Sequence, residues 1–448
     1  MDDKVLIIGS GLCGSLLAIK MAKRGYQVEV HERLPDMRQR QLGAGRSINL
    51  ALSNRGLKAL KAVGLETEVL KQCIGMDGRL IHSLEGKTWL SKYSGRSGER
   101  INSVSRPGLN IALLNKAESF DHVNLHFNSA CEHVDLEGAT AAFVDPIGNR
   151  TIVEPTVILG TDGAASVVRK SLMGKTQDLL FNFSQDFLRS GYKELEIPPS
   201  KAGGFRIEKN ALHIWPRGKF MMIALPNMDG SFTVTMFHPY EGEGGFNTLD
   251  TETKLLSFFE KYYVDALPHF PNLATEYFGN PVGILGTIKC YPWQAYGKAL
   301  IMGDAAHAIV PFYGQGMNAS FEDVHFFDET LGRHEGDWAA TFRAFQEERV
   351  ADTNAIADLA VDNFYEMQDK VADKIFIKKR ELEMRLEQNY NDYYSKYSLV
   401  TFREDLPYRE ALRRGRQQDE LLLNICSRPE AANIGLEEVH RELQNISV

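Results

Sequence analysis

Residues 4–14, KVLIIGSGLCG, decide the fold of this chain. The apolar run 5–8 is short and typical of a buried parallel strand. A glycine-rich turn follows it, and residues 16–24 have helical character up to Gly25, where a helix would end. Residues 27–32 then alternate like a second strand. The segment therefore predicts a strand–turn–helix–strand unit, the opening of a parallel sheet.

Gly9, Gly11 and Gly14 form a GxGxxG fingerprint between the first strand and the helix. Glycine lets the backbone approach a pyrophosphate at the helix N-terminus, where free N–H groups and the helix dipole favour anions. Glu32 follows 18 residues after Gly14, at a position suited to binding the ribose hydroxyls of an adenosine. A tight turn without a ligand is the plainer alternative. The fingerprint favours a dinucleotide but does not separate NAD from FAD.

The composition describes a soluble globular protein. The 448 residues suggest roughly three domains, and hydrophobic content of 43% with charged content of 25% excludes disordered and fibrous classes. The net charge of -8 argues against nucleic acid as a partner. The basic run 378–380 is followed by Glu381 and Glu383, so we expect it to be a solvated helix face.

The cysteine content and the hydropathy of the chain indicate in which cellular compartment we expect the protein. The five cysteines are odd in number and contain no CxxC pair, so neither a disulfide framework nor a structural zinc is expected. No apolar run approaches the roughly 18 residues that a membrane helix needs, and the N-terminus does not resemble a signal peptide. We expect a cytoplasmic protein with no metal and no membrane anchor.

Two further motifs follow predicted strands. In residues 157–169, VILGTDGAASVVR, a strand runs into Asp162; an aspartate that caps the next helix is an equally good interpretation. In residues 299–318, ALIMGDAAHAIVPFYGQGMN, a strand ends at Asp304, which is placed to hold a ribityl hydroxyl. His307 lies in this motif and is interpreted as structural, not as a catalytic base.

The rest of the chain divides into a β-rich middle and a helical tail. Short β-type runs at 211–215, 220–225 and 232–237, separated by turn signals, predict an antiparallel sheet. Residues 338–392 contain no proline or glycine and carry apolar residues at helical spacing, which predicts helices.

The three strand-end motifs, in this order, resemble the aromatic-hydroxylase family of FAD-dependent monooxygenases. That family carries a GxGxxG fingerprint, a mid-chain Asp-Gly and a late Gly-Asp around one FAD. The resemblance implies an α/β fold with a Rossmann-like FAD-binding domain, an antiparallel β-sheet substrate domain and a C-terminal helical region. The expected bounds are residues 1–70, 100–175 and 286–334 for FAD, 71–99 and 176–285 for substrate, and 335–448 for the helical domain.

Longer stretches are similar to the branch of this family that hydroxylates L-kynurenine at ring carbon 3, in tryptophan catabolism. They are residues 45–53 (GRSINLALS), 212–216 (LHIWP), 221–227 (MMIALPN), 310–318 (VPFYGQGMN), 363–367 (NFYEM) and 397–402 (YSLVTF). The resemblance implies L-kynurenine, O2 and NADPH as substrates. Choice of NADPH over NADH comes from the family alone, because no second GxGxxG is present.

The resemblance also implies site residues. Arg79 matches an arginine that grips the kynurenine carboxylate, with Tyr93 and Tyr397 beside it and Asn363 at the amino-acid head. An arginine fork suits a carboxylate, although by itself Arg79 would be taken for a surface residue. The expected FAD contacts are Gly9, Gly11, Cys13, Gly14, Glu32, Arg33, Ala51, Arg106, Cys131, Asp162, Asp304, Met317 and Asn318. The expected apolar wall is Leu212, Ile223, Leu225, Phe237, Pro311 and Phe312, for each of which ordinary core is an equal alternative.

The implied chemistry belongs to the flavin. A flavin C4a-hydroperoxide delivers OH to the carbon ortho to the aniline nitrogen, and that amino group activates the ring, so no protein acid or base is assigned. Tyr313 departs from the family, where Phe or His stands, and receives no role. The alternatives are a hydroxylase of another amino- or hydroxy-aromatic acid and a non-redox binding protein with the FAD fold.

Overall fold

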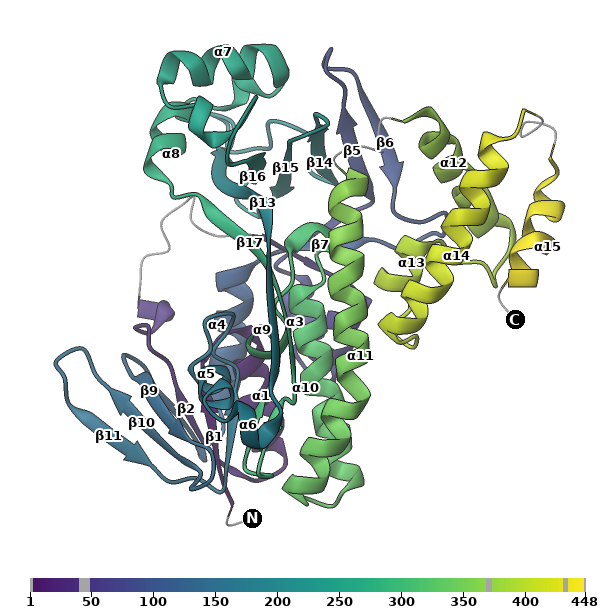
Figure 1. Cartoon of the computed structure of the whole chain (residues 1–448). Coiled ribbons are helices and arrows are strands. Elements are labelled where there is room, and N and C mark those ends of the chain that lie inside the picture. Colours follow the sequence, from purple (N-terminus) through teal and green to yellow (C-terminus); the bar gives the residue numbers. More distant parts are fainter. Residues whose placement is uncertain (1–2, 40–48, 368–372, 430–433, 447–448) are drawn as a thin grey trace.

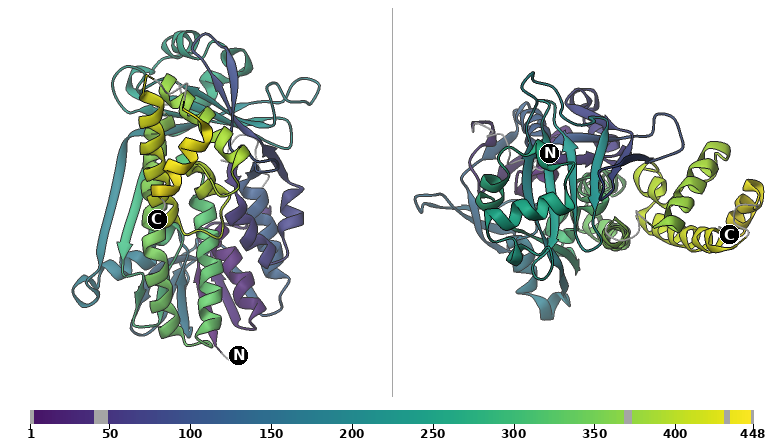
Figure 2. Two further views of the ribbon diagram at one scale, coloured as in Figure 1. Left: turned by 90° about the vertical axis from the view of Figure 1, so that its right-hand side faces the viewer. Right: turned by 90° about the horizontal axis from the view of Figure 1, so that it is seen from above.

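The computed structural model describes residues 3–39, 49–367, 373–429 and 434–446 (Figure 1). A body built around a parallel sheet occupies one end of the molecule, and a larger sheet with two covering helices occupies the other. The C-terminal helices stand to one side of both, as the view from above shows (Figure 2). The predicted stretch 45–53 lies only partly within the described residues, because 45–48 fall outside them.

The first sheet confirms the predicted βαβ opening. Its central strand is the apolar run after Asp3, and Val5, Leu6 and Ile7 have no exposed surface. Helix α1 (Leu12–Lys23) connects the first two strands, which pair in parallel. The strand order is β18 (Gln294–Ala295), β19 (Ala299–Ile301), β12 (Val157–Gly160), β1 (Lys4–Ile8), β2 (Gln27–His31) and β8 (Val123–His126).

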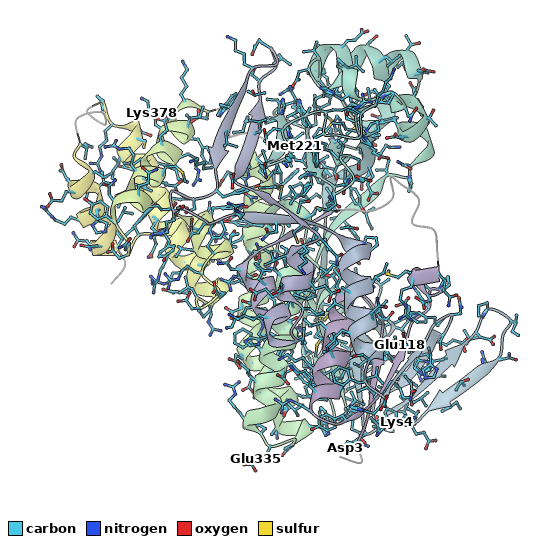
Figure 3. All side chains as sticks on the ribbon, turned by 180° about the vertical axis from the view of Figure 1, so that it is seen from behind. Asp3, Lys4, Glu118, Met221, Glu335 and Lys378 are labelled. Atoms are coloured by element: carbon cyan, nitrogen blue, oxygen red, sulfur yellow. The ribbon has the colours of Figure 1, made fainter. Side chains whose placement is uncertain are left out.

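The second sheet contains the three predicted antiparallel strands of the β-rich middle. Its order is β17 (Gly283–Tyr291), β13 (Asn182–Ile197), β16 (Phe232–Pro239), β15 (Met221–Pro226), β14 (Ala211–Pro216), β5 (Gly78–His82) and β6 (Thr88–Lys92). Strand β14 pairs with β5 in parallel, so the sheet is mixed at this one junction. Met221 is fully buried inside this sheet region, whereas Lys378 lies on the outer surface of the tail (Figure 3).

Two three-stranded sheets complete the β structure. One joins β3 (Asn49–Leu52), β7 (Ile101–Ser105) and β4 (Cys73–Met76), and it lies where the body meets the larger sheet. The other joins β9 (Ala130–Asp135), β10 (Thr140–Val144) and β11 (Arg150–Val153) and projects from the body (Figure 1).

Fourteen further α-helices lie in the described residues. Those of the body and the larger sheet are α2 (Asn54–Ala62), α3 (Glu66–Leu70), α4 (Arg106–Glu118), α5 (Val167–Met173), α6 (Thr176–Leu179), α7 (Glu252–Tyr262), α8 (Leu273–Gly279), α9 (Asp304–His307) and α10 (Gly316–Arg333). Those of the predicted helical tail are α11 (Trp338–Tyr365), α12 (Lys374–Asn389), α13 (Lys396–Thr401), α14 (Tyr408–Ser427) and α15 (Leu436–Ile446). Within the described ranges, none of these helices combines the length and the apolar character needed to cross a membrane.

The first half of α11 belongs to the core of the body. Trp338, Phe342 and Phe345 are buried in the same apolar cluster as the strands β1 and β12. The ring of Trp338 lies 5.1 Å from that of Tyr26, measured between centroids. The helical tail therefore begins inside the core of the body, without a free linker between them.

Strands β13 and β17 form a long ribbon that runs from the body into the larger sheet (Figure 1). At the body end Asn182 pairs with Tyr291, and at the far end Tyr192 pairs with Gly283. Beyond that point β13 continues against β16 as far as Ile197. One continuous strand thus connects the two parts of the molecule.

Candidate active site

The glycine turn leaves the N-terminus of α1 open to an anion. Gly9 has a φ of +99°, which favours glycine, and a Cβ on Gly14 would lie 1.9 Å from the carbonyl oxygen of Gly9. A Cβ on Gly11 would meet nothing within 4 Å, so space lies in front of the helix. No side chain caps α1 and its first turn carries no acidic residue. The helix N-terminus is therefore free for a phosphate group.

Glu32 closes this turn from the end of β2. Its Oε2 accepts a hydrogen bond from the Ser10 amide at 2.9 Å, and its Oε1 accepts one from the Leu34 amide at 2.9 Å. The carboxylate is thereby held beside the turn while further lone pairs remain for ribose hydroxyls. Arg33, the next residue, is exposed.

The other two strand-end motifs meet the glycine turn. Thr161 at the end of β12 donates its hydroxyl to the Gly9 carbonyl at 2.9 Å. Gly303 at the end of β19 has a φ of +59°, and a Cβ there would lie 3.1 Å from the Sγ of Cys13. The carboxyl ends of three parallel strands thus converge on one edge of the sheet, where this class of fold binds ligands.

Asp162 is placed mainly as a helix cap. Its Oδ2 accepts hydrogen bonds from the amides of Val167 and Val168 at 2.6 and 3.3 Å, at the start of α5. Its Oδ1 is buried and has no partner within the protein. Burial raises the pKa of this carboxyl. A buried acceptor without a donor is costly, so this oxygen is suited to a hydroxyl of a bound ligand.

Asn318 is fully buried near the start of α10 and is used by the chain itself. Its Nδ2 donates to the Ala51 carbonyl at 2.8 Å, and its Oδ1 accepts from the Ser53 amide at 3.0 Å. The side chain therefore fixes the end of β3 against α10. Any contact that Asn318 makes with a ligand has to come from its backbone.

The remaining predicted cofactor residues differ in exposure. Asp304 and Arg106 are exposed, Cys131 and Met317 are half-buried, and Ala51 lies 2.8 Å from where a Cβ on Gly314 would stand. Arg106 begins α4, which Ser105 caps through a hydrogen bond from the Gly108 amide. The set combines an open helix N-terminus, an unpartnered acceptor and an exposed carboxylate, which fits a dinucleotide such as FAD.

His307 is part of a buried ion network. Its Nε2 lies 2.5 Å from Oδ2 of Asp323, and Oδ1 of Asp323 accepts a hydrogen bond from Arg349 Nε at 3.0 Å. Burial alone would raise the pKa of Asp323, but His307 and Arg349 outweigh it and hold that pKa below its ordinary value. This placement supports the structural interpretation of His307.

A cavity of about 350 Å³ lies between the larger sheet and the tail. Its walls include Arg79, Tyr93 and Tyr397, three of the four residues predicted to bind the substrate. The rings of Tyr93 and Tyr397 stack with centroids 5.1 Å apart, and the rings of Tyr313 and Tyr397 stack with centroids 5.3 Å apart. The Arg79 guanidinium lies 4.9 Å from the centre of the Tyr397 ring. A cation thus lies against a column of three aromatic rings.

Both tyrosines beside Arg79 keep their protons. Burial, followed by Tyr397, raises the pKa of Tyr93 well above its ordinary value, although Arg79 opposes the shift. Burial also raises the pKa of Tyr397. Protonated phenols donate hydrogen bonds, so the two hydroxyls and the arginine offer three donors to an anion.

Asn363 does not line this cavity. It is buried in α11, and its Nδ2 donates to the Phe312 carbonyl at 2.6 Å. The predicted apolar wall lies next to the cavity: Leu212, Ile223 and Leu225 pack with Tyr93, and Phe237 and Phe312 pack with Tyr313, whereas Pro311 is exposed. Asn363 therefore supports the wall through the backbone at Phe312.

The prediction that residues 378–380 form a solvated face was wrong for Lys379. Its side chain is 3% exposed and forms ion pairs with Glu383, at 3.4 Å, and with Asp419. Lys379 lines the cavity together with Lys396 and Glu366, which pair at 3.0 Å. The i,i+4 spacing of Lys379 and Glu383 was the available signal for a buried pair. No such signal linked Lys379 to its distant partner Asp419.

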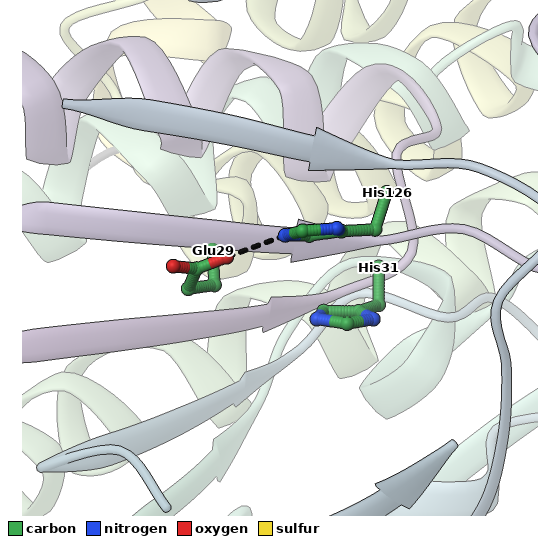
Figure 4. A group of neighbouring side chains, drawn as sticks. All are labelled: Glu29, His31 and His126. Atoms are coloured by element: carbon green, nitrogen blue, oxygen red, sulfur yellow. Dashed lines mark hydrogen bonds and ion pairs between the residues drawn. The ribbon is translucent and has the colours of Figure 1, made fainter. Parts of the chain in front are cut away.

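Glu29, His31 and His126 are the one group within the described ranges whose ligand atoms come close enough for a metal (Figure 4). His126 is already paired with Glu29 at 2.5 Å, and His31 bonds to Ser129 at 2.8 Å. The two imidazoles stack with centroids 4.4 Å apart, so their in-plane lone pairs run alongside each other and do not converge. The geometry favours an ion pair beside a buried histidine.

Comparison with known proteins identifies the family of the chain. Residues 2–181 and 290–359 match the family model described as FAD binding domain. The chain is 43% identical over 437 residues to kynurenine 3-monooxygenase of Myxococcus xanthus, covering 97% of this chain and 93% of that protein. It is 42% identical over 447 residues to kynurenine 3-monooxygenase of Dictyostelium discoideum, covering 97% and 95%.

Solved structures share the fold. The tetrameric form of 2-methyl-3-hydroxypyridine-5-carboxylic acid oxygenase has a TM-score of 0.66 at 18% identity, covering 93% of this chain and 98% of that one. P. aeruginosa PqsL in complex with 2-aminobenzoylacetate has a TM-score of 0.65 at 20% identity, covering 82% and 99%. At these identities the likeness concerns the architecture alone.

The converging strand ends, the open helix N-terminus and the family match define this chain as an FAD-dependent monooxygenase. The high identity to relatives over nearly their whole length narrows that class. The chain belongs to the kynurenine 3-monooxygenase family.

Proposed function

We propose that this protein hydroxylates L-kynurenine at ring carbon 3. In the balanced reaction, kynurenine, O2, NADPH and a proton give 3-hydroxykynurenine, NADP⁺ and water. The observation that carries the proposal is Arg79 with Tyr93 and Tyr397 at a cavity of about 350 Å³, a volume suited to a small ligand. The names of the relatives support the same substrate.

Three side chains bind the substrate carboxylate in this proposal. The Arg79 guanidinium offers two parallel N–H groups to the two carboxylate oxygens. The hydroxyls of Tyr93 and Tyr397, kept protonated by burial, donate to the remaining lone pairs. The stacked rings hold both hydroxyls in place, so little side-chain freedom is lost on binding.

The residues proposed to contact FAD bind and orient it. FAD, when bound, supplies the oxygen-transfer chemistry, which the protein's side chains do not carry. The N-terminus of α1 would hold the pyrophosphate, and Glu32 would hold the adenosine ribose. Asp162 and Asp304 would bind hydroxyls of the cofactor. The other residues proposed to contact FAD are Arg33, Ala51, Arg106, Cys131, Met317 and Asn318.

The apolar side chains next to the cavity exclude water from the substrate ring. Phe312 packs against Phe237 and Phe364, with ring centroids 4.8 and 4.5 Å away. Asn363 fixes the Phe312 backbone and thereby this wall. A dry surrounding protects a reactive oxygen species from loss to solvent. No acid or base from the protein is part of the proposal, because the amino group of the substrate activates its own ring.

The proposal includes three further points. They are the discontinuous domain bounds, the use of NADPH and a cytoplasmic location. Residues 1–70, 100–175 and 286–334 would bind FAD, and 71–99 with 176–285 would form the substrate sheet. The described strands complicate one boundary, because β4 lies in the second set but pairs with β7 in the first.

The test uses the purified, FAD-loaded protein. L-Kynurenine should stimulate NADPH oxidation and yield 3-hydroxykynurenine, whereas 4-hydroxybenzoate and anthranilate should not. NADH in place of NADPH tests the choice of reductant. Stimulation by 4-hydroxybenzoate or anthranilate, with hydroxylation of that compound, would show another aromatic acid to be the substrate. A colourless protein that binds no FAD would contradict the whole assignment.

A further inference from the structure

Arg55 is a buried arginine that the proposed function does not use. It lies in α2, is 2% exposed, and directs its guanidinium toward carbonyls of the tail. Its Nε donates to the Val400 carbonyl at 2.7 Å, and its Nη2 donates to the carbonyls of Arg403 and Leu406 at 2.9 and 2.7 Å. A longer bond of 3.4 Å reaches the Leu399 carbonyl.

These four carbonyls belong to the end of α13 and the loop after it. The last carbonyls of a helix have no partner within the helix and carry the negative end of its dipole. A buried cation with several N–H groups satisfies both requirements at once. The Arg55 guanidinium also lies 3.9 Å from the centre of the Tyr408 ring at the start of α14. Arg55 is thus the cap that holds α13 from its C-terminal end.

Helix α13 carries Tyr397, the middle ring of the tyrosine column at the substrate cavity. Tyr397 lies one helical turn before Val400, so movement of the α13 end moves this ring. At the other end of α13, Tyr313 stacks on Tyr397, and its hydroxyl lies 3.5 Å from the Lys396 carbonyl. The helix is six residues long and depends on such outside contacts.

The opposite side of Arg55 is tied to the cofactor region. Helix α2 begins after Ser53, whose amide is bound by Asn318, and Asn318 also binds the Ala51 carbonyl. A Cβ on Gly56 would lie 2.5 Å from the Asn318 Oδ1, so α2 and Asn318 are in close contact. The Nη1 of Arg55 donates to Glu322 of α10 at 2.6 Å.

We propose that Arg55 is a positioning residue for the hydroxylation. By capping α13 it holds Tyr397 at a fixed place relative to Ala51 and Asn318, which border the cofactor. Ala51 and Tyr397 already pack against one apolar cluster, which the anchored helix keeps closed. The inference rests on the proposed function only in the choice of kynurenine as the ligand.

The main experiment compares FAD-loaded wild type with Arg55→Lys. Lysine keeps the charge for Glu322, but one ammonium group cannot serve four carbonyls and a carboxylate in this fixed geometry. The kynurenine Kd, measured by calorimetry without NADPH, should rise about tenfold or more. The share of NADPH that ends as hydrogen peroxide should rise as well, while FAD content stays that of wild type. Hydrogen exchange in residues 396–401 should accelerate even without kynurenine.

Arg349→Lys is the matched control. Arg349 is equally buried and pairs with the same Glu322, at 3.2 Å, but it contacts no carbonyl of α13. It should lower the thermal midpoint and leave exchange in residues 396–401 at the wild-type rate. A folded, FAD-loaded Arg55→Lys enzyme with wild-type exchange in 396–401 would overturn the proposal, as would equal acceleration in both variants.

Two results would change how the experiment is read: wild type that does not bind kynurenine, and an Arg55→Lys variant that does not fold. If wild type does not bind kynurenine, the proposed function fails, and the exchange rates without ligand still decide the role of Arg55. If Arg55→Lys does not fold, exchange is measured on wild type with and without FAD. Removal of FAD should then accelerate exchange in 54–62 and 396–401 together, and acceleration confined to 54–62 would overturn the inference.

Discussion

Tyr93 and Tyr397 stack with their ring planes 10° from parallel, although one follows a strand near the N-terminus and the other lies in the helical tail. The contact joins two segments far apart in the sequence at the wall of the proposed substrate cavity. Because Arg79 lies against Tyr397, the cation and its neighbouring hydroxyls are complete only when the tail is folded against the sheet. The tail is therefore part of the proposed substrate site.

Replacement of Arg79 by alanine should weaken kynurenine binding and leave FAD in place. Loss of hydrogen bonds to a charged group costs about 1.5–3 kcal/mol, or about 10- to 150-fold in Kd. The measurement is the kynurenine Kd with FAD content from absorbance. Arg100→Ala is the control, since Arg100 is an exposed arginine paired with Asp77. Equal Kd values for the two variants would refute a carboxylate role for Arg79.

The ring of Tyr313 should contribute to the kynurenine KM, whereas its hydroxyl should contribute little. Its hydroxyl bond to Lys396 is long at 3.5 Å, so Tyr313→Phe should change the kynurenine KM by less than about threefold. Tyr313→Ala removes the ring stacked on Tyr397, and an aromatic pair contributes about 0.5–1.5 kcal/mol, up to about tenfold in KM. Steady-state kinetics of both variants decide the point. A larger loss in Tyr313→Phe than in Tyr313→Ala would contradict this ranking.

Glu32 should control retention of FAD. Glu32→Ala removes the acceptor for the ribose and for the Ser10 amide, so FAD affinity should fall about 10-fold or more. Titration of apoprotein with FAD measures the change. Glu29→Ala is the matched control, because Glu29 lies on the same strand but pairs with His126. If both variants retain FAD as wild type does, Glu32 has no ribose role.

His238 should make the protein less stable in mild acid. Burial lowers the pKa of His238 to about 4, and its two nitrogens contact the Gly244 carbonyl and the Tyr263 hydroxyl. The unfolded chain takes up the proton near pH 6.5, whereas the folded protein resists it until about pH 4. The stabilisation from neutral His238 is therefore complete above about pH 6.5 and is lost as the pH falls toward 4.

The variant His238→Gln tests this dependence. It should be less stable than wild type at pH 7, by about 1–3 kcal/mol for the lost buried hydrogen bonds. Its free energy of unfolding should fall less steeply between pH 6.5 and 4, by about one proton. Urea unfolding at several pH values provides both quantities. A slope identical to that of wild type would show that His238 does not take up the proton on unfolding.

Local patterns predicted the elements whose contacts are near in sequence. The run 5–8, the glycines and the alternation at 27–32 lie within one βαβ unit, so their periodicity is enough to identify it. The parallel pairing of β14 with β5 joins segments that are far apart in the chain, and no local pattern reports such a pairing. The same holds for the ribbon of β13 and β17.

The site residues divide in the same way. Gly9, Gly11 and Glu32 are readable from spacing, whereas Arg79 is identifiable only through the family resemblance. Lys379 was misjudged because its charge looked solvated, and its partner Asp419 comes from another helix. Burial of a charge depends on a partner that tertiary structure supplies.

The ribbon of β13 and β17 has a mechanical consequence. Its paired strands cross from the body into the larger sheet, with a register shift between Phe187 and Gly191, so bending elsewhere along the ribbon would break main-chain hydrogen bonds. We therefore expect the ribbon to limit movement of the body relative to the larger sheet. The opposite wall of the cavity contains α12 and α13, which are held by side chains. We expect this wall to move more easily, and the passage that admits the substrate to open there.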